Sequence, residues 1–137
     1  PYSQRQKVTN SSSVYEVLRN IFPTETIDYR ETFIVLFLNK AHQILGYSVV
    51  AEGGISQVVV DVKMIMQGAL LANASVIILA HNHPNGFAVP SMADIKATQE
   101  FISVLEPIGV NLADHIIVSK DDCFSMAKSK KYSSLFG

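Results

Sequence analysis

The chain has 137 residues, 48% of them hydrophobic, and a mean hydropathy of +0.23. This length and composition suit one globular domain with a single buried core and argue against a disordered chain. Eleven Lys and Arg residues against twelve Asp and Glu residues give a net charge of −1. This charge argues against a dedicated nucleic-acid binder, because such proteins usually have a basic excess.

The single cysteine, Cys123, excludes an internal disulfide and a cysteine-rich zinc site. An unpaired thiol is typical of proteins in a reducing compartment. No run approaches the ~20 apolar residues needed to cross a bilayer, and no signal-peptide pattern opens the chain. These features together indicate a cytoplasmic protein that does not contact a membrane, and they leave the oligomeric state open.

Residues 1–10 are polar and predict a flexible lead-in, which leaves residues 11–137 as the domain. Ser12 or Ser13 could cap a short helix that carries apolar residues at helical spacing and ends at Pro23. Two apolar runs then follow, rich in β-branched and aromatic residues, at Thr32–Leu38 and Ile44–Ala51. They predict a β-hairpin whose strands are largely buried.

The rest of the chain alternates short apolar runs with segments of helical spacing. In chain order these predict a strand at Val58–Val60, a helix over Asp61–Asn73 capped by Asp61, a strand at Ser75–Ala80, a loop over Pro84–Pro90, a helix over Met92–Glu106 and a strand at Val110–Val118. Mixed in this order, strands and helices indicate an α/β domain of layered α+β type.

Two histidines stand where the buried strand Ser75–Ala80 ends, in the run His81-Asn82-His83. Side chains two residues apart in a strand point to the same face, so both imidazoles can reach one metal ion. Asp94, beyond the loop, is placed to supply a third ligand. Three protein ligands with an open fourth position are typical of a catalytic zinc ion, whereas a structural site is closed by four.

Another explanation competes for part of this pattern. Ser91-x-x-Asp94 before a helical run is also a capping box, and taken alone capping explains these two residues better. Capping does not explain two histidines on one face, and a buried imidazole pair without a shared ligand is unfavourable. The roles are compatible, since one Asp94 oxygen could bind zinc while the other accepts a backbone N–H.

The spacing His-x-His, seven residues, Ser-x-x-Asp resembles the JAMM motif of the MPN-plus metalloproteases, which also has an upstream glutamate. The longer pattern is similar to the RadC branch of that family in three segments: His81–Gly86 with Pro90, Ser91 and Asp94; Glu31–Leu38; and Asp114–Val118. The resemblance runs from about Ser11 to Phe124. It implies a single MPN/JAB-type domain, with a mixed, mostly antiparallel sheet flanked by helices.

The resemblance also implies a ligand set and a chemistry. One Zn²⁺ per chain would be held by His81, His83 and Asp94, although iron or manganese could occupy the same donors. Such a zinc ion lowers the pKa of its water from 15.7 toward roughly 7. RadC proteins commonly have Ser where Asn85 stands and His-Pro-Arg in place of Asp61-Val62-Lys63. Neither departure touches a ligand.

The reaction implied is hydrolysis of a peptide, isopeptide or related amide bond. From the residues alone Glu25, Glu31 and Glu52 could each act as the general base, and the resemblance assigns that role to Glu31, which directly precedes a buried strand. Ser91 resembles the family serine whose hydroxyl stabilises the oxyanion.

Other polar residues have simpler explanations. His115 beside Asp114 is expected to form a hydrogen-bonded structural pair rather than a fourth ligand, and His42 to lie on the surface in a turn. Asn82 and Asn85 could orient a loop or a substrate through their amides, although turn formation accounts for Asn85.

Three functions follow for comparison. The first is a zinc metallopeptidase or isopeptidase that acts on a protein or peptide. The second is a DNA-associated RadC-type protein in DNA repair or processing, with the metal site vestigial or repurposed, which the charge of −1 does not support. The third is an inactive scaffold that binds protein partners, which ranks last because every motif position is filled.

Overall fold

The chain is described by a computed structural model that covers residues 7–22, 31–53, 62–83 and 88–137. The helices and strands follow in the order α1 (Ser11–Ile21), β1 (Glu31–Leu38), β2 (Ile44–Gly53), α2 (Val62–Ala72), β3 (Val76–Asn82), α3 (Met92–Leu105), the 3-10 helix η2 (Glu106–Ile108), β4 (Asn111–Val118), β5 (Cys123–Ser125) and the 3-10 helix η3 (Ser133–Phe136).

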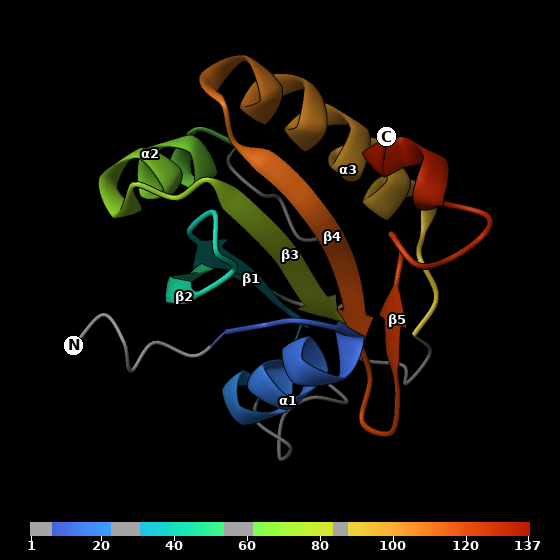
Figure 1. Ribbon diagram of the computed structural model, residues 1–137. Helices are drawn as coiled ribbons and strands as arrows, with labels where there is room; N and C mark the ends of the chain where they lie inside the picture. The colour runs from blue at the N-terminus through green and yellow to red at the C-terminus, as the bar shows by residue number, and fades with distance from the viewer. Residues whose placement is uncertain (1–6, 23–30, 54–61, 84–87) are drawn as a thin grey trace.

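The strands form one five-stranded sheet in the order β2-β1-β3-β4-β5. Only β3 and β4 are parallel, and the other neighbours are antiparallel. Helix α1 covers one face of the sheet, and α2 and α3 lie on the other (Figure 1). The predicted layered α/β domain with a mixed, mostly antiparallel sheet is therefore confirmed.

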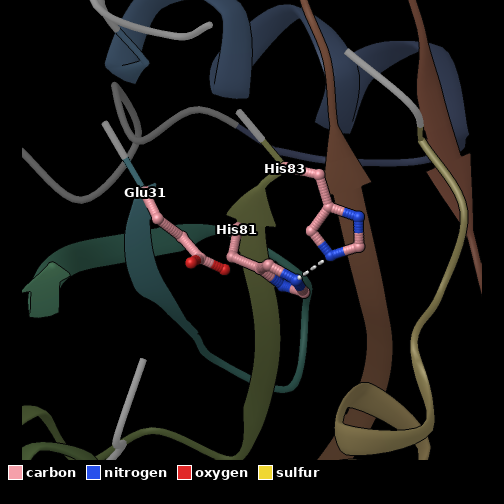
Figure 2. A group of neighbouring side chains, drawn as sticks. All are labelled: Glu31, His81 and His83. Atoms are coloured by element: carbon pink, nitrogen blue, oxygen red, sulfur yellow. Dashed lines mark hydrogen bonds between the residues drawn. The ribbon is translucent and has the colours of Figure 1, made fainter. Parts of the chain in front are cut away.

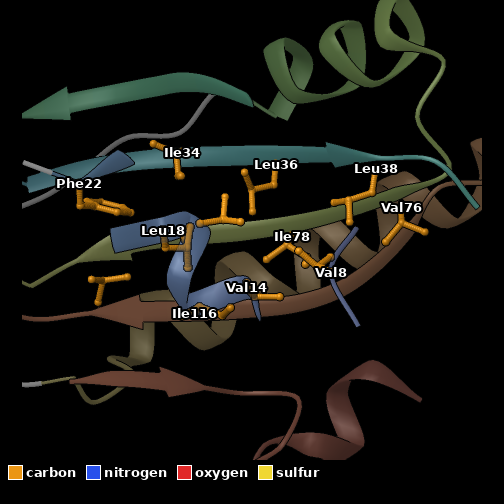
Figure 3. Close-up of a cluster of buried hydrophobic side chains, with 13 residues drawn as sticks. Val8, Val14, Leu18, Phe22, Ile34, Leu36, Leu38, Val76, Ile78 and Ile116 are labelled. Carbon is orange, nitrogen blue, oxygen red and sulfur yellow. The ribbon is translucent and has the colours of Figure 1, made fainter. Parts of the chain in front are cut away.

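Strands β1 and β3 are buried on both faces because their residues are almost all apolar. Alternate side chains of β1, among them Ile34 and Leu36, point toward α1 and pack with its Leu18 in one core cluster (Figure 3). The intervening residues, such as Phe33 and Val35, pack in a second cluster with α2 and α3. Side chains of β3 alternate in the same way, so Ile77 and Leu79 pack on the side of α2 and α3.

The beginning of the chain differs from the prediction. Asn10, not Ser12 or Ser13, caps α1, and its side chain accepts the N–H of Ser13. Val8 is buried in the core, and residue 7 bridges to the hairpin turn. For residues 7–10 the expectation of a flexible lead-in is therefore wrong, because an apolar side chain there packs into the domain.

Other elements follow the prediction to within a few residues. The strand expected at Val58–Val60 and the cap at Asp61 lie outside the described residues. The short strand β5 and the helix η3 were not predicted. Among the described residues, the helices are all too short or too polar to span a lipid bilayer.

Replacing the buried Leu18 should destabilise the domain. Its side chain is 0% exposed, so Leu18→Ala is expected to lower the free energy of unfolding by about 2–5 kcal/mol. Glu16→Ala on the exposed face of the same helix is the matched control and should change it by less than about 0.5 kcal/mol. Urea denaturation followed by circular dichroism measures both, and equal midpoints would contradict the packing in Figure 3.

Candidate metal centre

The two histidines lie at the end of β3, the central strand of the sheet. His81 pairs in register with Phe33 of β1, and His83 directly follows the strand. Their side chains point the same way, and the two Nε2 atoms lie 2.9 Å apart (Figure 2). The ring of Phe33 stacks on His81 with the centroids 5.3 Å apart and the planes 5° from parallel, which restricts the imidazole.

Asp94 reaches the histidines from the first turn of α3. Its Oδ1 lies 3.0 Å from Nε2 of His81, and its Oδ2 lies 3.2 Å from Nε2 of His83. The same carboxylate completes a capping box, because Oδ2 accepts the N–H of Ser91 at 2.7 Å and Ser91 Oγ accepts the N–H of Asp94 at 3.1 Å. Capping holds the carboxylate toward the imidazoles, so the two roles of Asp94 coexist.

The three side chains fit a zinc ion by distance and by chemistry. Bonds of 2.0–2.1 Å in a tetrahedral site put neighbouring ligand atoms about 3.3 Å apart. The observed separations of 2.9, 3.0 and 3.2 Å are close to that edge length. Two imidazoles and a carboxylate also form a donor set that zinc accepts. The side chain of His81 is only 2% exposed, whereas that of Asp94 is 11% and that of His83 18% exposed, so the cluster opens to solvent on one side.

The carboxyl group of Asp94 is held in its ionised form. Burial opposes ionisation, but hydrogen bonds from the side chains of His81 and His83 outweigh it and keep the pKa of Asp94 well below its ordinary value. A carboxylate binds a metal ion only when deprotonated. The electrostatics of the cluster therefore favour the state that a ligand needs.

Glu31 begins β1, next to the histidines. Its carboxylate and the donor atoms of His81 and His83 all lie within 4.8 Å of one another, and Figure 2 shows the carboxylate directed toward His81. Burial raises the pKa of Glu31, while the nearby imidazoles oppose the shift. A raised pKa suits a general base that works near neutral pH. Of the alternatives, Glu25 lies outside the described residues, as does the side chain of Glu52.

Asn82 holds the beginning of β1 in place. Its Oδ1 accepts the backbone N–H of Thr32 at 2.8 Å, one residue after Glu31. Asn82 lies between the two histidines in sequence and is 1% exposed. The amide oxygen thus holds the strand that carries Glu31, and the expectation that the amide orients a loop or a substrate stays a prediction.

His115 was expected to form a structural pair with Asp114, and this holds only for its backbone. The Asp114 carboxylate accepts the N–H of His115 at 2.7 Å and that of Ala127 at 2.9 Å. The His115 imidazole points elsewhere: its Nε2 lies 3.0 Å from Nδ1 of His81, and its Nδ1 lies 2.7 Å from Oγ1 of Thr98. Burial lowers the pKa of His115 to about 3, and the nearby charge of His81 adds to the shift.

A β-bulge in β4 turns His115 toward α3. Leu112 of β4 pairs with Ile77 of β3, but the next pair is Asp114 with Ile78, so Ala113 is an extra residue. Leu112 and His115, three residues apart, therefore both face α3. Without the bulge, alternation would turn His115 toward α1.

The remaining candidates lie away from the cluster or lack reactivity. His42 is exposed in the turn before β2, as expected, with a positive φ of 60°. Burial raises the pKa of the Cys123 thiol, which disfavours the thiolate. A cavity of about 450 Å³ lies at the far end of α3 and is lined by Ile102, Val110 and C-terminal residues, not by the metal-centre residues.

Comparison with known proteins places the chain in a family. Residues 8–132 match the family described as RadC-like JAB domain. The UPF0758 protein plu4865 of Photorhabdus laumondii is 36% identical over 121 residues, which is 88% of this chain and 51% of that protein. The UPF0758 protein PsycPRwf_0491 of a Psychrobacter species is 40% identical over 124 residues, 90% of this chain and 55% of that protein. The chain thus spans about half the length of these relatives. It belongs to the family of RadC-like JAB domains.

Proposed function

We propose that this domain is a zinc-dependent hydrolase of peptide, isopeptide or related amide bonds. The observation that carries the proposal is the convergence of His81, His83 and Asp94 at separations of 2.9–3.2 Å, with the Glu31 carboxylate alongside. Two imidazoles and one carboxylate would supply three ligands to a zinc ion, and the partial exposure of His83 and Asp94 would give water and substrate access to it. This is the arrangement of a catalytic zinc ion rather than a structural one.

When bound, the zinc ion supplies a Lewis acid that polarises the substrate carbonyl and makes a water molecule more acidic. Glu31 accepts a proton from the attacking water and delivers it to the amide nitrogen as the C–N bond breaks. The products are a carboxylate and an amine, so the proton taken from water ends on the leaving group. Burial supports this role, because it raises the pKa of Glu31 above its ordinary value.

Ser91 is suited to stabilise the tetrahedral intermediate. Its Oγ accepts the N–H of Asp94, which leaves the hydroxyl proton for another acceptor. The residue is exposed, and its backbone is held by the capping box beside the open side of the cluster. We propose that the hydroxyl donates a hydrogen bond to the developing oxyanion of the substrate.

The substrate we propose is a protein or peptide, and the compartment is a reducing one such as the cytoplasm, in keeping with one unpaired cysteine. Substrate choice belongs to the whole protein, and the match to this chain spans only about half the length of the relatives. The alternative of a DNA-associated role has the charge of −1 against it.

Metal content after reloading tests the proposal. The purified chain, treated with a chelator, reloaded with zinc and freed of excess metal, should hold about one zinc ion per chain by mass spectrometry. His42→Ala controls for zinc that binds to histidines in general. This exposed histidine lies outside the cluster, so its loss should leave the zinc content unchanged. The zinc-loaded chain should cleave members of a fluorogenic peptide and isopeptide library. No stoichiometric metal in the reloaded chain would overturn the proposal.

A further inference from the structure

We propose that Thr98 and His115 form a buried relay of hydrogen bonds that holds the proton of His81 on Nδ1, leaving Nε2 as the metal-binding atom. Both are positioning residues, since they act on the metal ligand His81 and touch neither the metal position nor the substrate. The effect on zinc binding rests on the proposed function, whereas the donor and acceptor of each hydrogen bond follow from the geometry alone.

Thr98, in the second turn of α3, determines which atoms donate the hydrogen bonds of the relay. Its Oγ1 lies 2.7 Å from the backbone carbonyl oxygen of Asp94, which can only accept a hydrogen bond. Thr98 must therefore donate its single hydroxyl proton to that oxygen. Oγ1 also lies 2.7 Å from Nδ1 of His115, and with its own proton used it must accept there. Nδ1 of His115 therefore carries a proton.

The position of the His115 proton then determines the position of the His81 proton. His115 is 0% exposed, and a second ring proton would place a positive charge in the core, which is unfavourable. A neutral imidazole that is protonated on Nδ1 has an acceptor at Nε2. Because this Nε2 lies 3.0 Å from Nδ1 of His81, the proton between them belongs to His81.

The far side of the His81 ring then faces the metal position. When zinc is bound, Nδ1 donates to His115 and the Nε2 lone pair is left for the metal; without metal, Nε2 lies 2.9 Å from Nε2 of His83 and 3.0 Å from Oδ1 of Asp94, to which it can donate a second ring proton. Each of these atoms is itself a metal donor, so a cation between them satisfies all three. The relay also explains why His115 is not a ligand although its donor atom lies within 4.8 Å of those of His81 and Asp94. Its Nε2 is committed to the opposite nitrogen of His81.

Thr98 ties this tautomer to the helix that supplies Asp94. One hydroxyl group contacts both the backbone of Asp94 and the imidazole that orients His81. The Phe33 ring stacks on His81 and makes a T-shaped contact with His115, so the aromatic contacts restrict the rotation of both imidazoles. Hydrogen-bond partners of this kind typically change metal affinity by 10–100-fold when removed.

The tautomers can be read directly by long-range proton–nitrogen correlation NMR on chain labelled with ¹⁵N-histidine. The chain has four histidines, so variants that each replace one of them assign the signals. We expect the Nδ1–H tautomer for His115 with and without zinc, a proton on Nδ1 of His81, and a shift of His81 Nε2 when zinc is added. A proton on Nε2 of His115 would overturn the relay. If zinc does not shift the His81 Nε2 signal while His115 is still protonated on Nδ1, the metal site is refuted and the relay is not.

Variants of Thr98 provide the second measurement. Thr98→Val has the same shape without the hydroxyl, and we expect its zinc affinity, measured by competition with a fluorescent chelator, to fall about 10–100-fold. Thr98→Ser should restore it. Ser103→Ala is the matched control, because the Ser103 hydroxyl also bonds a carbonyl of α3 but lies on the exposed face. Wild-type zinc affinity in Thr98→Val would overturn the proposal, and the NMR test decides if this variant does not fold.

Discussion

Glu31→Gln is expected to bind one zinc ion per chain and to lower kcat/KM for amide hydrolysis by about 10²–10⁴-fold. The amide has the shape of the carboxylate but cannot accept the proton of the attacking water. The three side chains in mutual contact, His81, His83 and Asp94, remain intact in this variant. Metal analysis and hydrolysis of the best library peptide, measured on the same sample, separate binding from catalysis.

The control for this variant is Glu100→Gln, which removes the charge of an exposed glutamate on α3 and should change neither quantity. The informative contrary result is loss of zinc from Glu31→Gln. The donor atoms of Glu31, His81 and His83 lie within 4.8 Å of one another, so such a loss would make Glu31 a ligand rather than a base. Retained zinc together with unchanged hydrolysis would assign the proton transfer to another group.

Much of the site was predictable because local rules fix it. A continuous apolar run predicts that β3 is central, and strand alternation then places His81 and His83 on one face. The capping box predicts both the beginning of α3 and the orientation of Asp94, since the same hydrogen bonds serve both. The positions of these residues can be predicted without knowing any contact between segments that are distant in the sequence.

The partners of His81 depend on contacts that no local pattern reveals. Thr98 lies inside a helix, and its bond to the carbonyl four residues earlier is common for threonine, so nothing in the sequence marks it. His115 reaches the α3 face only because Ala113 is accommodated as a bulge. A histidine directly before the apolar run Ile116–Val118 was the one available signal, and the neighbouring Asp114 offered a simpler explanation for it.

The errors at the beginning of the chain have a different cause. Asn10 and the three serines after it can each cap a helix, so composition does not select one. The choice is made by Val8, whose burial fixes where the chain enters the domain. Likewise β5 has three residues, too few for a periodic pattern, and it forms by pairing with β4.

Asp94→Ala is expected to abolish stoichiometric zinc binding and with it hydrolysis. Removal of a residue that only supports a ligand typically lowers metal affinity 10–100-fold, so loss of a ligand should exceed about 100-fold. In the present geometry both oxygens of the carboxylate face imidazole nitrogens, at 3.0 and 3.2 Å. Competition with a fluorescent zinc chelator measures the affinity, and urea denaturation in a chelating buffer measures stability without metal.

The capping box makes a direct comparison possible, because the same carboxylate also stabilises the beginning of α3. Ser91→Ala removes the hydroxyl that accepts the Asp94 N–H and leaves the carboxylate in place. It should lower the free energy of unfolding by about 1 kcal/mol and keep zinc bound. Asp94→Asn retains an oxygen for the Ser91 N–H but loses the charge, so it should preserve the helix better than it preserves zinc. Zinc bound to Asp94→Ala as tightly as to the wild type would place the third ligand elsewhere. Among the described residues Glu31 would then be the candidate, because its carboxylate lies within 4.8 Å of the donor atoms of His81 and His83, whereas the relay turns His115 toward the opposite nitrogen of His81.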